Sequence, residues 1–182
     1  MRNILVKLFT VLVITAIGAF GADDSLGTWK LNLKKSKFKP RAPVKSLTTT
    51  REAAEGGVKQ ISTGEQADGT KINYSYTAQY DGAEYPVTGA PWDIISIKQV
   101  DSNTFTIVTK KIGGKYESTG RTVISKDGKT MTTTSKGTNT EGKPFTYTMV
   151  LEKQSGDQSG TDATINTHSS PITPAQPKPG KK

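Results

Sequence analysis

The side chains that most often carry out enzyme chemistry are scarce in this chain. Its 182 residues include no cysteine and a single histidine, His168, which lies in a polar segment near the C-terminus. Without cysteine there is no thiol nucleophile, thiolate metal site or iron–sulfur cluster. A serine nucleophile would also lack a histidine partner in the central region of the chain. The sequence therefore predicts a protein that is not an enzyme and that binds no cofactor or metal ion.

Carboxylates remain as candidates for acid–base chemistry, but turn geometry explains most of them. Aspartate followed by glycine is the ordinary composition of a tight turn, because the aspartate side chain hydrogen-bonds to the nearby backbone. Six acidic residues cluster at expected turns or strand ends: Glu52, Glu55, Asp68, Asp81, Glu84 and Asp93. We interpret them as turn residues and not as a catalytic pair.

Aromatic residues and methionines recur at every second position in the segments 71–80 and 144–153. Alternate side chains of a strand lie on one face of its sheet, so each segment is predicted to have one aromatic face. Tyrosine combines an apolar ring with a hydroxyl, which suits a pocket for a small apolar or amphipathic molecule. The same stripes are also what a completely packed core would need, and both interpretations stay open. The residues expected to line a pocket are Tyr74, Tyr76, Tyr80, Phe105, Met131, Phe145, Tyr147 and Met149.

The elements that would position these side chains are short strands separated by tight turns. Asp-Gly pairs at 68–69, 81–82 and 127–128 are strong hairpin signals, because glycine adopts the positive φ that such turns need. The intervals between turns are too short for crossover helices and are rich in Thr, Val, Ile and Tyr. We expect about ten strands, at residues 27–33, 44–52, 57–65, 70–80, 84–88, 92–100, 104–112, 115–125, 129–138 and 143–153.

Successive short hairpins make an antiparallel meander whose apolar face must be covered. Closing the meander on itself covers that face and removes the exposed sheet edges. The sequence therefore predicts an all-β fold, an up-and-down antiparallel meander β-barrel of about 8–10 strands, with a β-sandwich as the alternative. A barrel of ten strands would be wider than the roughly eight-stranded barrel that side chains can just fill.

The first expected strand opens with the motif Gly27-Thr28-Trp29. Gly-x-Trp at this place in a small meander barrel resembles the lipocalin and fatty-acid-binding-protein superfamily, the calycins. The resemblance covers residues 26–153, and the segments 80–91 and 125–132 resemble a group of secreted bacterial lipocalin-like proteins of unassigned function. It implies that Gly27 and Trp29 close one end of the barrel and that a late arginine, Arg121, packs across the tryptophan.

The chain departs from these families at the positions that would define ligand chemistry. Fatty-acid-binding proteins carry an Arg-x-Tyr clamp for the ligand carboxylate on the last strand, where this chain has Met149 and Leu151. The lipocalin Thr-Asp-Tyr motif and cysteines are missing too. Trp92 follows the turn "GAP" at a strand start, and we expect it at the barrel mouth or, preferably, covering the rim.

The positive charge of the expected domain is concentrated in one connection. Residues 23–154 hold 20 basic and 14 acidic residues, and the whole excess lies within 34–45. Such a run can attract an anionic surface, or it can simply be a solvated loop. Its basic residues are Lys34, Lys35, Lys37, Lys39, Arg41 and Lys45.

The two ends of the chain are not expected to belong to the barrel. Residues 1–21 read as a signal peptide, because two basic residues precede a short apolar run and small residues then suit cleavage after Gly21. From residue 155 to 182 the chain has no aromatic residue and is rich in Pro, Ser, Thr and Gly, which predicts a disordered tail. The domain is therefore residues 23–154, and we expect it to be secreted or periplasmic.

The leading hypothesis is an exported, monomeric barrel that carries a small lipophilic molecule. The alternatives are a filled barrel that works as a protein-interaction or inhibitor module, and attachment to an anionic envelope surface through residues 34–45. Nucleic-acid binding is not expected, because the aromatic residues alternate within strands and form no exposed stacking platform.

Overall fold

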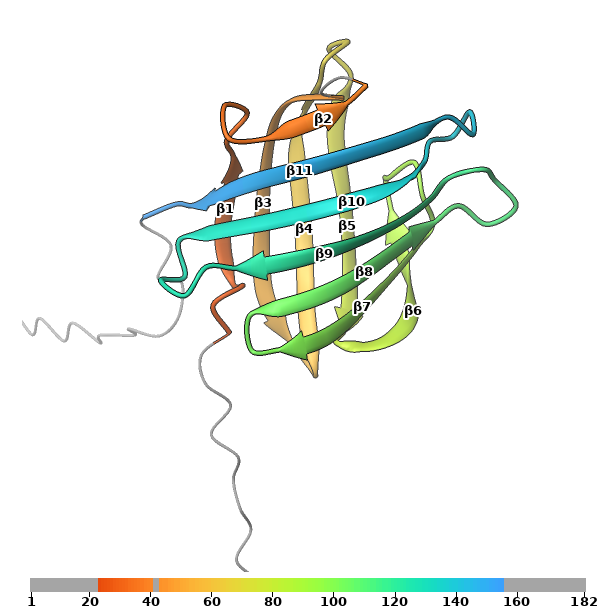
Figure 1. The fold of residues 1–182 in the computed structure, drawn as a ribbon. Helices are drawn as coiled ribbons and strands as arrows, with labels where there is room; N and C mark the ends of the chain where they lie inside the picture. The colour runs from red at the N-terminus through yellow and green to blue at the C-terminus, as the bar shows by residue number, and fades with distance from the viewer. Residues whose placement is uncertain (1–22, 41–42, 156–182) are drawn as a thin grey trace, which may run out of the picture.

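The computed structural model describes residues 23–40 and 43–155, which form one closed antiparallel sheet (Figure 1). Its strands pair in the order β1-β3-β4-β5-β6-β7-β8-β9-β10-β11-β2, and β1 also pairs with β11. This last pairing closes the sheet, so the fold is an all-β up-and-down barrel and not a sandwich. The strands are β1 (Gly27–Leu31), β2 (Lys37–Lys39), β3 (Val44–Ala54), β4 (Gly57–Gln66), β5 (Lys71–Gln79), β6 (Asp81–Thr88), β7 (Ile94–Asp101), β8 (Thr104–Lys110), β9 (Glu117–Ile124), β10 (Thr130–Thr138) and β11 (Pro144–Lys153).

The ten expected strands are all present, and β2 is an addition to them. One half of β11 pairs with β1, at Leu151 to Lys153, and the other half pairs with β2, at Thr146 to Thr148. Ser36 fixes the bend between β1 and β2, because its hydroxyl donates to the Asn32 carbonyl and accepts from the Val150 N–H. The chain therefore leaves the barrel sheet after β1 and returns as β2, which pairs with the same neighbouring strand, β11.

The apolar core occupies the barrel end at which Trp29 lies. Its largest fully buried side chain is Trp29, and the described core includes residues from nine of the strands. Alternation along each strand places these side chains inward, since every second residue shares a face. The core residues are Trp29, Leu47, Val58, Tyr76, Ala78, Ile95, Ile97, Phe105, Ile124, Met131 and Leu151.

The pairing between β5 and β6 is the shortest in the ring. Only Ser75 with Thr88 and Tyr76 with Val87 are partners, whereas β10 and β11 are paired along their whole length. Beyond Thr88 the chain passes so close to β5 that a Cβ on Gly89 would lie 2.2 Å from the Asn73 carbonyl oxygen. Glycine at position 89 is what permits this approach.

The expected signal segment, residues 1–21, and all but the first residue of the expected tail lie outside the described residues. Within the described part of the chain, no helix has the length and apolar character needed to cross a membrane.

Candidate functional site: the two ends of the barrel

The eight residues expected to line a pocket divide between two regions of the barrel. Tyr76, Phe105 and Met131 are buried in the packed core. Tyr80 packs on Phe105, with 4.8 Å between the ring centroids, and so belongs to the same region. Tyr74, Phe145 and Tyr147 lie together toward the opposite end, and Met149 packs against the core between them. The expected residues therefore do not form one continuous wall.

The Trp29 end of the barrel is closed. Trp29 has no exposed surface, and its indole Nε1 donates to the carbonyl of Ser25 at 2.9 Å. The Lys153 ammonium lies 5.2 Å from the centre of the indole ring, within the range of a cation–π contact. Arg121 does not occupy this place: it is exposed on β9, so the expectation that it packs on Trp29 was wrong. Lys153 takes that position because it is the register partner of Trp29 in β11.

A buried arginine, Arg51, organises the polar groups just inside the closed end. Its guanidinium donates to Gln60 Oε1 at 2.8 Å, to Tyr80 Oη at 3.2 Å and to Ser25 Oγ at 3.3 Å. Tyr80 in turn donates to Asp23 at 3.0 Å, so the phenol of Tyr80 links the Arg51 guanidinium to the Asp23 carboxylate. A small cavity of about 10 Å³ adjoins the arginine, which is room for about one water.

Buried pairs of hydroxyl groups extend this polar region. Thr49 and Ser62 are 2.9 Å apart, and Thr122 and Thr133 are 2.8 Å apart. Ser62 also accepts a hydrogen bond from Gln60, and Thr122 lines the small cavity beside Arg51. The hydroxyl pairs therefore belong to the same polar region as Arg51.

The end of the barrel opposite Trp29 is lined by six aromatic rings in continuous contact, which we name the aromatic end cluster. Trp92 lies at its centre, stacked on Tyr116 at 5.3 Å and edge-on to Tyr74 at 5.4 Å. The contacts continue through rings 5.9–6.1 Å apart. The cluster consists of Phe38, Tyr74, Trp92, Tyr116, Phe145 and Tyr147.

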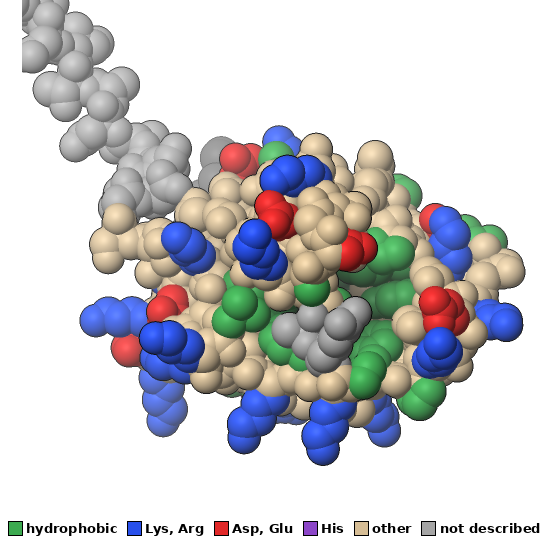
Figure 2. Space-filling view, turned by 90° about the horizontal axis from the view of Figure 1, so that it is seen from above, with side chains coloured by type: hydrophobic (Ala, Val, Ile, Leu, Met, Phe, Trp, Pro, Cys, Tyr) green, Lys and Arg blue, Asp and Glu red, His purple; other side chains and the backbone are tan. Residues whose placement is uncertain are grey.

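The rings of the aromatic end cluster are partly accessible, whereas the side chains of the core are buried. Burial raises the pKa of Tyr74 and Tyr147, because a phenolate would be poorly solvated there. Both side chains nevertheless keep some surface that is accessible to solvent. Trp92 Nε1 is buried and has no hydrogen-bond partner in the described part of the chain. Seen from above, hydrophobic side chains gather in the middle of this end with charged side chains around them (Figure 2).

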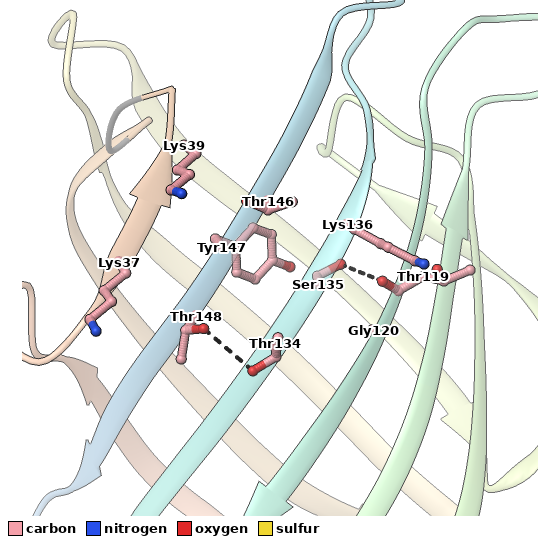
Figure 3. A pocket seen from close by; sticks show the side chains of 10 residues that line it. All are labelled: Lys37, Lys39, Thr119, Gly120, Thr134, Ser135, Lys136, Thr146, Tyr147 and Thr148. Atoms are coloured by element: carbon pink, nitrogen blue, oxygen red, sulfur yellow. Dashed lines mark hydrogen bonds between the residues drawn. The ribbon is translucent and has the colours of Figure 1, made fainter.

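A groove also lies on the outer side of the barrel. A groove of about 600 Å³ runs across β2, β11, β10 and β9, with Lys37 and Lys39 on one side and Lys136 on the other (Figure 3). It is lined by Lys37, Lys39, Thr119, Gly120, Thr134, Ser135, Lys136, Thr146, Tyr147 and Thr148. Apart from Tyr147, none of the residues expected to bind a ligand contributes to it.

The basic residues of the 34–45 segment do not form one continuous patch. Lys35 pairs with Glu152 and Lys45 pairs with Glu65, both at 2.8 Å. Lys37 and Lys39 have no acidic partner in the described residues and lie on the outer groove, while Lys34 is exposed beyond β1. Arg41 lies outside the described residues.

Three members of the aromatic end cluster were not among the predicted ligand residues: Phe38, Trp92 and Tyr116. Trp92 and Tyr116 lie in connections between strands, and Phe38 lies in the three-residue strand β2, so alternation gives no indication of their direction. In the described residues there is no group of three or more His, Cys, Asp or Glu side chains that is arranged to hold a metal ion.

Comparison with known proteins gives distant structural likeness alone. No protein-family model matches the chain, and no curated protein sequence matches it, so the resemblance to a secreted bacterial group has no support. The crystal structure of zebrafish ileal bile acid-binding protein complexed with cholic acid is similar to 72% of this chain and 98% of that chain, with 12% identity and a TM-score of 0.41. A likeness at this level does not identify a ligand for this chain.

Proposed function

We propose that this protein is an exported, non-enzymatic barrel that binds a small apolar or amphipathic molecule at its aromatic end. The observation that carries the proposal is the aromatic end cluster, in which deep-lying Tyr74 and Tyr147 remain partly accessible. A flat apolar ligand would stack on these rings, and the buried Trp92 N–H offers a hydrogen bond to an acceptor on it. Export rests on residues 1–21 of the sequence, which the structure does not describe.

The site is distinct from the closed end, and this difference defines the test. Anilinonaphthalenesulfonate is a suitable probe, since it is amphipathic and becomes fluorescent in apolar surroundings. We expect saturable binding that quenches tryptophan emission in the wild-type protein. In a Trp92→Phe variant the remaining emission comes from buried Trp29, and we expect the saturating probe to quench it less than it quenches the wild-type emission, because Trp29 lies at the opposite end.

A second pair of variants links binding to the cluster. Tyr116→Ser is expected to weaken binding at least about tenfold, because it removes a ring that contacts both Trp92 and Phe145. Ile112→Ser lies in the same connection but is exposed, so it is the matched control and should bind normally. Equal behaviour of the two variants, or no saturable binding by the wild-type protein, would contradict the proposal. Native mass spectrometry of protein from its source cells would then identify the natural ligand.

A filled barrel that acts on a partner protein is the second candidate. The packed core and the cavity of only about 10 Å³ beside Arg51 favour it, because they leave no room for a ligand in the closed half. It predicts recovery of one specific protein partner and no bound small molecule.

A further inference from the structure

The register of the sheet aligns basic side chains in two neighbouring rows on the outer face of the barrel. In each row every residue is the direct partner of the next on the adjacent strand, and neither row contains an acidic residue. The first row, from β2 to β8, is Lys39, Thr146, Lys136, Thr119 and Val108. The second, from β2 to β7, is Lys37, Thr148, Thr134, Arg121, Thr106 and Lys98. We name the five cations of the two rows, Lys37, Lys39, Lys98, Arg121 and Lys136, the basic outer face.

Sheet geometry sets the spacing of these charges. Adjacent strands are about 4.8 Å apart and same-face residues about 7 Å apart along a strand. The Lys39 and Lys136 backbones are therefore roughly 10 Å apart, and Lys37 is one step along the strand from Lys39. The charges form a grid and not an isolated pair, with threonine hydroxyls between them.

These cations are not neutralised by the described part of the protein. None of the ion pairs within 4 Å involves Lys37, Lys39, Lys98, Arg121 or Lys136. Acidic residues stand where the rows reach β6, because Asp81 is the partner of Lys98 and Glu84 follows Val108 and Ser96 beyond the end of the first row. Asp101 also lies near, and its pKa is held low first by the Asn103 backbone N–H and more weakly by Arg121. By contrast, the lysines on the opposite side of the barrel, Lys45, Lys59 and Lys71, all pair with glutamates. The excess charge of the barrel is thus directed to one side.

The shape and composition of this face favour a polymer chain over a membrane. The groove of about 600 Å³ is hollowed between the lysines of β2 and Lys136, so a narrow chain can lie in it while a flat bilayer would meet only its rim. Its only large apolar side chain, Tyr147, faces the barrel interior and stacks on Phe145. Nothing in the groove is thus placed to insert among lipid tails or to stack nucleic-acid bases.

We propose that the basic outer face binds a linear acidic polysaccharide, whose carboxylates contact Lys37, Lys39 and Lys136 and whose hydroxyls hydrogen-bond to the threonines between them. A cleft lined by one sign of charge concentrates ions of the opposite sign. Threonine hydroxyls donate and accept hydrogen bonds, which matches the hydroxyl groups of a sugar. The charged groups of the site lie on the outer side of the sheet, whereas the aromatic end cluster lies inside, and Tyr147 is the residue that the two have in common.

Two triple variants of the full chain with equal charge test this proposal. The first is Lys37→Gln, Lys39→Gln and Lys136→Gln, and the matched control is Lys45→Gln, Lys59→Gln and Lys71→Gln. Binding to polygalacturonate is measured by calorimetry at two salt concentrations, with neutral dextran and anionic phosphatidylglycerol vesicles as comparison ligands. Circular dichroism of each variant checks that the barrel is folded.

We expect the wild-type protein and the control triple variant to bind polygalacturonate and not dextran, with affinity that falls as salt is raised. The first triple variant should bind roughly tenfold more weakly. Equal losses of affinity in both triple variants would show that net charge alone determines binding, and would overturn the proposal. No binding of polygalacturonate by folded wild-type protein, or tighter binding to the vesicles than to the polymer, would overturn it as well.

Discussion

At the scale of single residues, the contacts of Trp29 explain how one end of the barrel is closed. Its ring is wholly buried, its N–H is satisfied by the Ser25 carbonyl, and the Lys153 ammonium lies over one face. A side chain with this surround has no freedom to move aside for a ligand. We therefore expect Trp29 to stabilise the fold and not to contact a ligand.

Truncation of this residue gives the first prediction. Trp29→Ala should lower the free energy of unfolding by about 3–5 kcal/mol, because it removes a large buried ring and leaves a cavity. Lys30→Ala, the exposed neighbour on the same strand, should change it by less than about 0.5 kcal/mol. Urea denaturation of both variants measures the difference. A Trp29→Ala protein as stable as the control would show that the indole does not close the barrel.

Glu65 gives a second prediction at this scale. Hydrogen bonds and charge attraction from Lys45 and Lys71 lower the pKa of its carboxyl to about 2 from 4.5. Because the folded-state pKa is depressed, its contribution to stability is present above pH 4.5 and is lost as the pH falls toward 2. Nuclear magnetic resonance titration of the Glu65 carboxyl should give a midpoint well below that of a free glutamate. In a Glu65→Gln variant, stability should depend less on pH within this window; an ordinary midpoint for Glu65 would contradict the ion pairs.

At the scale of elements, the short seam between β5 and β6 depends on the close approach of Gly89 to β5. Gly89 has φ +83° and no room for a Cβ, whereas Gly69 has a similar φ of +89° and open space around it. Alanine at position 69 should therefore cost roughly 1–2 kcal/mol for the left-handed backbone alone. Alanine at position 89 should cost a further ~1–3 kcal/mol from the clash with Asn73. Thermal unfolding of the two variants separates these terms, and equal costs would show that β6 does not lie against β5 as described.

The elements also show which parts of the fold could be predicted from sequence. Alternation in 71–80 and 144–153 is a local property, so it correctly predicted β5, β11 and their inward faces. β2 was not predicted, because the short segment Lys-Phe-Lys has little strand propensity and forms a strand only where β11 offers a free partner. Arg121 was misplaced because the residue opposite Trp29 depends on how β11 meets β1, which is a long-range register.

The candidate site was predictable only in part, for a similar reason. Tyr74, Phe145 and Tyr147 were found through their spacing on strands. Trp92 and Tyr116 join them only because two connections at the same end of the barrel bring them together, and spacing in the sequence contains no information on that meeting. Likewise, the charge of residues 34–45 was recognised, but its division between paired and unpaired lysines follows from which strands carry the glutamates.

At the scale of the whole molecule, the ring of strands buries or crowds all six tyrosines. The pKa of each is raised, with burial as the largest cause in every case. Since the folded pKa lies above the unfolded value of about 10, the neutral phenols support the fold fully below that pH. This support is lost as the pH rises above it.

Alkaline titration provides a prediction for the closed ring as a unit. The ultraviolet absorbance of phenolate should rise mainly above pH 10, together with the loss of the β-sheet circular dichroism signal. The same protein unfolded in guanidinium should titrate near the ordinary value. If several tyrosines ionise near pH 10 while the sheet signal is intact, the barrel interior is open to solvent along its whole length.

The central claim is that one end of the barrel is stoppered and the other receives a ligand. The two tryptophans mark these two ends, so the indole N–H resonances of Trp29 and Trp92 in a nitrogen-15 correlation spectrum report on each separately. On titration with anilinonaphthalenesulfonate, the account predicts a progressive, saturable shift of the Trp92 resonance while that of Trp29 stays in place. A shift of Trp29 with Trp92 unmoved, or no shift of either at saturating probe, would contradict it.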